Sequence, residues 1–121
     1  MEASKARGSI LRREPVINEH PIVRTHPVTK EKALYINKQF TRRIVGFKLE
    51  ESDNLLNFLY DHSAFGTDFQ VRFKWAERTV VVWDNRVTLH LALVDWSSGQ
   101  RRHLARITPQ AERPFETPFN A

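Results

Sequence analysis

The stretch TVVVWDNRVTLHLALVDWSSGQRRHLARIT, residues 79–108, organises the fold predicted for this 121-residue chain. It holds two apolar runs, at residues 79–83 and 87–94, separated by a polar break at residues 84–86. A Ser-Ser-Gly turn then leads into a third run that contains three arginines. Short apolar runs bounded by turn residues are typical of β-strands, so this stretch predicts three strands in close succession.

Side-chain alternation within these runs places one histidine and two arginines on defined faces, because successive residues of a strand point to opposite sides. One face of the run at 87–94 is apolar, and His90 lies on the other face among small neighbours, where a ligand has room. Arg102 and Arg106 share a face and lie roughly 13 Å apart along an extended strand. A single histidine in a strand is more often a structural group than a ligand, so that alternative stays open.

The Ser97-Ser98-Gly99 turn predicts a hairpin with Gly99 in the left-handed conformation. A simple hairpin closed there pairs Asp95 with Arg101 and puts Arg106 opposite His90. This register is a hypothesis, because a slip of one residue exchanges the two faces.

Composition restricts the class of protein. With 121 residues, 40% of them hydrophobic, the chain suits one domain with a modest core. It has no apolar run of about 18 residues and no apolar segment of the kind found in secretory signals. Cysteine is absent, which excludes disulfides and thiolate metal sites. We therefore expect a cytoplasmic protein without a membrane span.

The formal net charge of +5 is compatible with a nucleic-acid surface or with sites for small anions. Basic residues are spread along the whole chain, without a run of about five or more, so the sequence favours small anions. A basic nucleic-acid-binding domain is kept as the less favoured alternative.

The remaining segments predict a mainly β fold with one α-helix. Strands are expected at residues 20–26 and 33–37, joined by a turn at residues 27–31. A helix is expected at residues 50–62, with an apolar stripe that packs in the core and Gly66 after its end. Residues 69–75 alternate as a half-buried strand. The total of six or seven short strands predicts an antiparallel sandwich or barrel.

The chemistry of His90 and the paired arginines points to a site for a metal and an acid. A neutral imidazole binds iron, zinc or copper. An arginine fork binds a carboxylate or a sulfonate through two parallel hydrogen bonds. One histidine cannot hold a metal alone, so further ligands are needed.

The chain resembles the taurine dioxygenase-like (TauD/TfdA) family of Fe(II)- and 2-oxoglutarate-dependent dioxygenases. The resemblance is carried by WDNRVTLH at residues 83–90 and QRRHLAR at residues 100–106. HPIVRTHPVTKEKALYIN at residues 20–37 and ESDNLLNFLYDH at residues 51–62 also look like the C-terminal half of that family. The fold implied is a double-stranded β-helix, or jelly roll, in which the histidine and arginine strands belong to opposed sheets rather than to one simple hairpin.

The resemblance also implies roles for three residues. His90 resembles the distal histidine of the iron triad. Arg102, 12 positions later (102 − 90), resembles the arginine that pairs with the far carboxylate of 2-oxoglutarate. Arg106 resembles the arginine that meets an anionic substrate group such as a sulfonate. Oxidation beside sulfur in such a substrate implies release of an aldehyde and sulfite.

The sequence departs from the family pattern at the first two iron ligands, which a His-x-Asp or His-x-Glu motif supplies. No histidine of the chain has an acid two positions later; the residues found there are Ile22, Val28, Ala64, Ala92 and Ala105. Asp84 and Asp95 flank the His90 strand, but Asp84 is better explained as the cap of the WDNR turn through an Asx hydrogen bond.

We therefore expect a flexible tail at residues 1–14, the C-terminal portion of a TauD/TfdA-like domain at residues 15–114, and a second tail at residues 115–121. The expected cofactors are Fe(II) and 2-oxoglutarate, and the expected partner is a small anionic substrate, without nucleic acid or membrane. A catalytically inactive remnant or an interaction module is the alternative. The oligomeric state, including a homo-oligomer, stays open.

Overall fold

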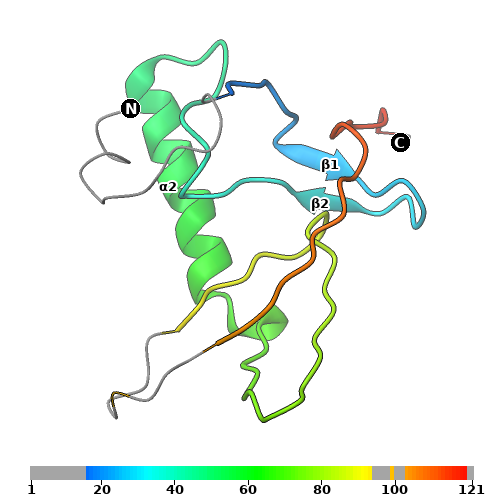
Figure 1. The fold of residues 1–121 in the computed structure, drawn as a ribbon. Helices are drawn as coiled ribbons and strands as arrows, with labels where there is room; N and C mark the ends of the chain where they lie inside the picture. The colour runs from blue at the N-terminus through cyan, green and yellow to red at the C-terminus, as the bar shows by residue number, and fades with distance from the viewer. Residues whose placement is uncertain (1–15, 94–98, 100–102, 120–121) are drawn as a thin grey trace.

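The structure of the chain is a computed structural model that describes residues 16–93, 99 and 103–119 (Figure 1). The predicted tail at residues 1–14 lies outside these ranges. So do Arg102 and both ends of the Asp95–Arg101 pair from which the hairpin register is predicted. Gly99 is described and has a φ of 56°, the left-handed conformation that the turn predicts for it.

A short antiparallel hairpin forms where two strands are expected. Strand β1 (Val23–Thr25) pairs with β2 (Lys32–Leu34), with Arg24 opposite Ala33. The turn between them closes through the Lys30 N–H, which donates to the His26 carbonyl at 3.0 Å. Strand β1 lies within the predicted segment 20–26, whereas β2 begins one residue before the predicted segment 33–37 and ends at Leu34; each strand is three residues long.

Helix α2 (Leu49–Phe65) contains the helix predicted at residues 50–62 and extends it at both ends. The Glu51 carboxylate accepts a hydrogen bond from the Lys48 N–H at 3.1 Å and so satisfies a donor at the start of the helix. At the other end the Gly66 N–H donates to the His62 carbonyl at 3.0 Å, and a 3-10 turn, η1 (Thr67–Phe69), follows. Gly66 suits this site because a Cβ there would lie 2.2 Å from the Phe69 ring.

The core lies between α2 and the segment that follows β2. Its buried apolar members are Ile36, Ile44 and Leu56. Partly buried residues pack against these three, including Leu59 and Tyr60 from the predicted helical stripe. The buried Ser52 hydroxyl accepts a hydrogen bond from the Ile44 N–H at 2.9 Å, which ties the loop to the helix.

The end of the described chain runs along β1. The Thr25 N–H donates to the Phe115 carbonyl at 2.9 Å, and the Thr117 N–H donates to the Thr25 hydroxyl at 2.9 Å. Thr25 is thereby fully enclosed, with an exposed fraction of 0%. The predicted tail at residues 115–121 therefore contains residues that pair with the hairpin.

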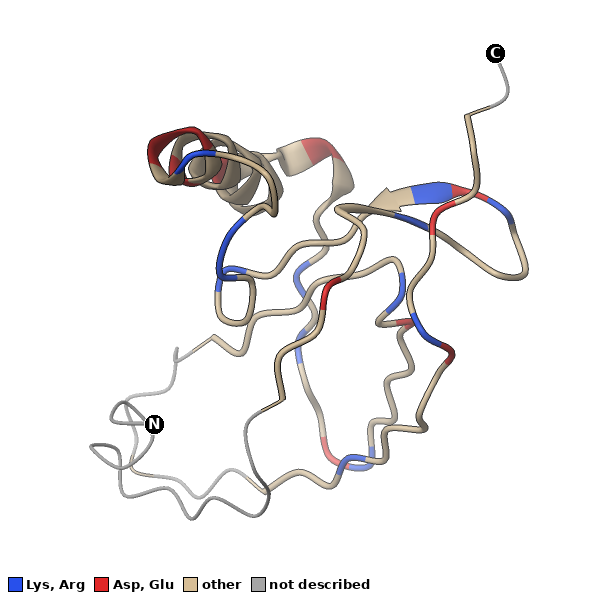
Figure 2. Ribbon diagram, turned by 90° about the horizontal axis from the view of Figure 1, so that it is seen from above, with Lys and Arg blue, Asp and Glu red and all other residues tan. Residues whose placement is uncertain are grey.

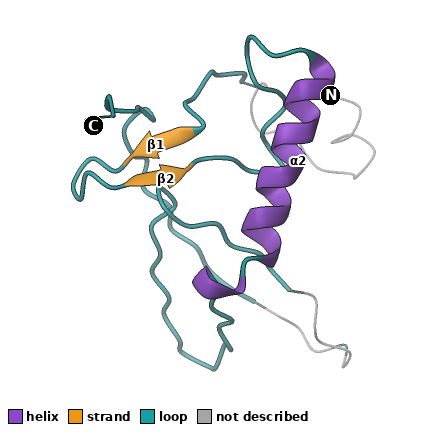
Figure 3. Ribbon diagram, turned by 180° about the vertical axis from the view of Figure 1, so that it is seen from behind, coloured by secondary structure: helices purple, strands orange, loops and turns teal. Residues whose placement is uncertain are grey.

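The described residues form no strand in the segments expected at 69–75, 79–83 and 87–94, nor in residues 103–108 of the arginine-containing run. The prediction of six or seven strands therefore exceeds the number that the described residues form. Phe69 ends η1, and the described segments after it run as extended loops, two of which return to the hairpin, at the WDNR turn and near residue 115 (Figure 3). The half-buried face predicted at 69–75 is exposed, with Val71 92% exposed. A strand requires backbone hydrogen bonds to a neighbouring strand, and the described residues form no such ladder with these segments.

Charged residues of both signs lie on several segments of the described chain (Figure 2). Helix α2 differs, since it contains acidic residues but no Lys or Arg. Among the described residues, no helix has both the length and the apolar character needed to cross a membrane.

Candidate functional site

His90 lies on the extended segment that follows the WDNR turn, and its side chain is exposed. Its ring centroid lies 4.9 Å from that of Trp83, and the two planes are inclined at 52°. Trp83 is itself held by its indole N–H, which donates to Asn85 at 2.9 Å. The turn therefore positions the imidazole, while the described residues do not enclose it between two layers.

Of the two predicted anion-binding arginines, the structure describes Arg106 but not Arg102. Arg106 lies on the extended segment at residues 103–119 and is exposed. No ion pair joins it to a carboxylate within the described ranges. Arg102 lies outside the described residues, so its predicted role stays a prediction.

The described residues do not complete a site for iron. No group of three histidine, aspartate or glutamate side chains comes together in the described part of the chain. Iron in this kind of site needs two imidazoles and a carboxylate arranged on one face. His90 alone provides one donor, so no catalytic step is assigned to these residues by themselves.

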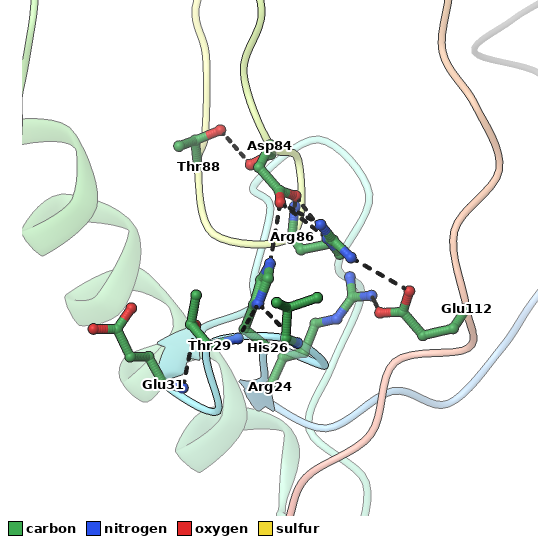
Figure 4. A network of polar contacts seen from close by, with 9 residues as sticks. Arg24, His26, Thr29, Glu31, Asp84, Arg86, Thr88 and Glu112 are labelled. Atoms are coloured by element: carbon green, nitrogen blue, oxygen red, sulfur yellow. Dashed lines mark hydrogen bonds and ion pairs between the residues drawn. The ribbon is translucent and has the colours of Figure 1, made fainter.

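The structure instead brings together a polar network from three distant segments (Figure 4). Strand β1 and the turn after it contribute Arg24 and His26, the WDNR turn contributes Asp84 and Arg86, and the C-terminal segment contributes Glu112. His26 Nε2 lies 3.1 Å from Asp84 Oδ2, and Arg86 Nη2 lies 2.6 Å from the same oxygen. The network therefore joins the hairpin to the turn that leads to His90.

Asp84 caps the WDNR turn as the sequence predicts. Its carboxylate accepts the Arg86 backbone N–H at 2.8 Å, which is an Asx turn, and also the Arg86 guanidinium. These bonds, led by the one from the Arg86 side chain, hold the pKa of the Asp84 carboxyl well below its usual range, and His26 contributes in the same direction. The Asp84 side chain in turn raises the pKa of Arg86. Both groups are therefore charged at neutral pH.

Glu112 joins two arginines to the C-terminal segment. Its carboxylate pairs with Arg24 and lies 3.7 Å from Arg86. Its own backbone N–H and then Arg24 lower the pKa of the Glu112 carboxyl. Arg24 is only 3% exposed and lies over the Tyr35 ring, 4.9 Å from its centroid. The buried guanidinium thus pairs with one carboxylate and lies over one aromatic face, while its Nε has no hydrogen-bond partner among the described residues.

Three residues of this network, Arg24, His26 and Glu112, were missed by the sequence analysis. A signal for two of them exists, because Arg24 and His26 are two positions apart and so fall on one face of an extended segment. Two polar residues on one face of a short strand are either solvated or paired. The sequence offers nothing that connects them to Asp84 or to Glu112, 58 and 88 positions away.

A cavity of about 390 Å³ lies near the start of the described chain. It is lined by Asn18, His20 and residues 110–114. Neither His90 nor Arg106 reaches it. The cavity therefore does not mark the candidate site, which is identified by the predicted ligand residues His90 and Arg106 instead.

Comparison with known proteins matches the chain to the family described as taurine catabolism dioxygenase TauD, TfdA family, over residues 3–108. The match includes both the WDNR turn and the arginine-rich segment.

Several curated proteins are also similar. An alpha-ketoglutarate-dependent sulfonate dioxygenase of Saccharomyces cerevisiae is 52% identical over 115 residues, which is 95% of this chain and 28% of that protein. The alpha-ketoglutarate-dependent dioxygenase cnsM of Penicillium expansum is 50% identical over 107 residues, 88% of this chain and 30% of its own length. An alpha-ketoglutarate-dependent sulfate ester dioxygenase of Pseudomonas putida is 38% identical over 84 residues, 69% of this chain and 27% of its length. The chain therefore spans under a third of the length of these relatives.

Proposed function

The chain belongs to the taurine catabolism dioxygenase (TauD/TfdA) family, and we propose that it forms the C-terminal part of an Fe(II)- and 2-oxoglutarate-dependent dioxygenase that oxidises a small organic sulfonate. Membership in this family implies 2-oxoglutarate as co-substrate and Fe(II) as cofactor. The observation that carries the proposal is the 52% identity, over nearly the whole chain, to a sulfonate dioxygenase.

Within this proposal three residues divide the binding work. His90 provides one imidazole donor to the iron, Arg102 pairs with the distal carboxylate of 2-oxoglutarate, and Arg106 pairs with the sulfonate. An imidazole is a preferred ligand of iron, and a guanidinium matches the geometry of both anions. The remaining iron ligands come from a part of the enzyme outside this chain, since no histidine here is followed by an acid two positions later.

The proposed architecture is part of a jelly roll. The exposed apolar segments after α2 support it, because Val82 is 90% exposed and Ile107 is 93% exposed. Exposed apolar surface of this extent is typical of a surface that another layer of the protein covers. Iron bound in the complete site would supply the activation of oxygen. The residues of this chain would bind the iron, 2-oxoglutarate and the sulfonate and orient them.

A chimera tests the proposal. This chain replaces the matching 115 residues of the Saccharomyces cerevisiae relative. Sulfite release from taurine is then measured with Fe(II) and 2-oxoglutarate. We expect Arg102→Ala to raise the KM for 2-oxoglutarate about ten- to a hundredfold, because a charge-assisted pair contributes about 1.5–3 kcal/mol.

The neighbouring Arg101→Ala is the matched control, since it removes the same charge one residue away and on the opposite face of an extended strand. An Arg102→Ala chimera with an unchanged KM for 2-oxoglutarate removes Arg102 from this role. Sulfite release by the 121-residue chain alone, above that of its own Arg102→Ala variant, contradicts the proposal that ligands are needed from outside it.

A further inference from the structure

The hydrogen bonds around His26 fix which ring nitrogen carries its hydrogen. Nδ1 accepts hydrogen bonds from the backbone N–H groups of Val28 at 3.2 Å and Thr29 at 3.0 Å. A nitrogen that accepts from two donors is unprotonated, so the hydrogen of the neutral ring is on Nε2. Nε2 faces Asp84 Oδ2 at 3.1 Å and therefore donates to it (Figure 4). The side chain of His26 is only 7% exposed, whereas that of Asp84 is 34% exposed, so the imidazole end of this bond is shielded from water.

Asp84 transmits this contact to the start of the His90 segment. Its backbone carbonyl accepts the N–H of Val87 at 3.2 Å and the N–H of Thr88 at 3.0 Å. The Thr88 hydroxyl donates to the same oxygen at 2.6 Å. One residue thus holds the turn through its carbonyl and is itself held through its carboxylate. Displacement of Asp84 would move residues 87 and 88, which lie three and two positions before His90.

A second route to His90 passes through Trp83, the residue before Asp84. Its ring lies against the His90 ring at 4.9 Å. The contacts from His26 to His90 are therefore continuous. The His26 ring contacts the Asp84 carboxylate, Asp84 follows Trp83 in the turn, and the Trp83 indole contacts the His90 imidazole. Apart from the contact with Trp83, the described residues make no ring contact or hydrogen bond with the His90 side chain that would set its position.

We propose that His26 is a positioning residue that holds the WDNR turn through Asp84 and thereby sets the position of the His90 imidazole. The role at the iron rests on the proposed function. The hold on the turn does not, because it is a property of this chain without metal. Outer contacts that orient a metal ligand commonly change metal affinity by ten- to a hundredfold when they are removed.

Two substitutions of His26 separate this role from a local one in the hairpin turn. His26→Asn keeps an acceptor near the position of Nδ1 for Val28 and Thr29 but cannot reach Asp84. His26→Gln keeps a donor near the position of Nε2 for Asp84 but loses the acceptor for the turn. We expect His26→Asn to accelerate exchange of the Thr88 amide hydrogen about tenfold and to shift the His90 ring signals, because about one hydrogen bond is lost.

His26→Gln is expected to leave the Thr88 amide and the His90 ring close to their native signals. Equal effects of the two variants on Thr88 and His90 overturn the inference. Since these signals are read in the 121-residue chain without iron, this failure is distinct from failure of the proposed function.

A second measurement uses the chimera. The Fe(II) concentration that gives half-maximal activity is expected to rise at least about tenfold for His26→Asn and to stay near the native value for His26→Gln. A purely structural role lowers the amount of active enzyme without changing this concentration, and that result overturns the positioning role.

Discussion

His26 Nε2 and Asp84 Oδ2 lie 3.1 Å apart, although 58 positions separate the two residues in the chain. This contact joins the β1–β2 hairpin to the WDNR turn, in a structure whose described residues form only one small sheet. The WDNR sequence therefore has a structural role in the described chain, because its aspartate makes this contact. Its aspartate begins the turn and also accepts a hydrogen bond from a buried imidazole of another segment.

Acid should disrupt this network through Asp84, whose pKa is lowered in the folded chain chiefly by Arg86. An aspartate has a pKa of about 3.9 when unfolded. The stabilisation is therefore complete above that value and is lost as pH falls from there toward the lower pKa of the folded state. In a carboxyl NMR titration, Asp84 is expected to stay ionised below pH 4. Arg86→Gln should return its midpoint toward the ordinary value, and an unchanged midpoint contradicts the assigned cause.

The buried Ser52 hydroxyl should matter more than a similar hydroxyl elsewhere on α2. Ser52→Ala leaves the buried Ile44 N–H without its acceptor, so the free energy of unfolding is expected to fall by about 1–3 kcal/mol. Ser63→Ala is the matched control, because Ser63 only donates to Leu59 in its own helix. Its effect should stay within about 0.5 kcal/mol. Denaturant unfolding followed by circular dichroism compares the two, and equal losses contradict the role of Ser52.

The exposed apolar segments should make the isolated 121-residue chain self-associate. Val80 and Val82 are 86% and 90% exposed on the segment that enters the WDNR turn. We expect an apparent mass by sedimentation that rises with concentration, and a smaller rise for Val80→Thr combined with Val82→Thr. Val28→Thr is the control, since that valine is 75% exposed but belongs to the hairpin turn rather than to the segments after α2. A concentration-independent monomer contradicts the expectation.

The parts of the structure that sequence predicts well are those that local rules determine. The amphipathic spacing of Leu56 and Leu59 predicts α2, the turn residues between β1 and β2 predict the hairpin, and the Asx rule predicts the role of Asp84. All three depend on interactions within a few residues, so the sequence contains the information needed.

The parts that sequence predicts poorly depend on distant partners. The alternation of Phe69–Trp75 is typical of a strand, but a strand forms only beside another one, and the described residues provide none. In the same way, the pairing of Arg24 with Glu112 joins positions that no local pattern connects. The site at His90 is predicted by family resemblance, and in the proposed function its remaining iron ligands come from outside this chain.

The most direct test of the central claim is Fe(II)- and 2-oxoglutarate-dependent sulfite release by the chimera, with His90→Ala compared with His103→Ala. Loss of an iron ligand is expected to lower activity by more than about a hundredfold, whereas His103→Ala should stay within about twofold of the unsubstituted chimera. Equal activity of the two variants, or an inactive unsubstituted chimera, would contradict the claim that this chain supplies His90 to the iron of a sulfonate dioxygenase.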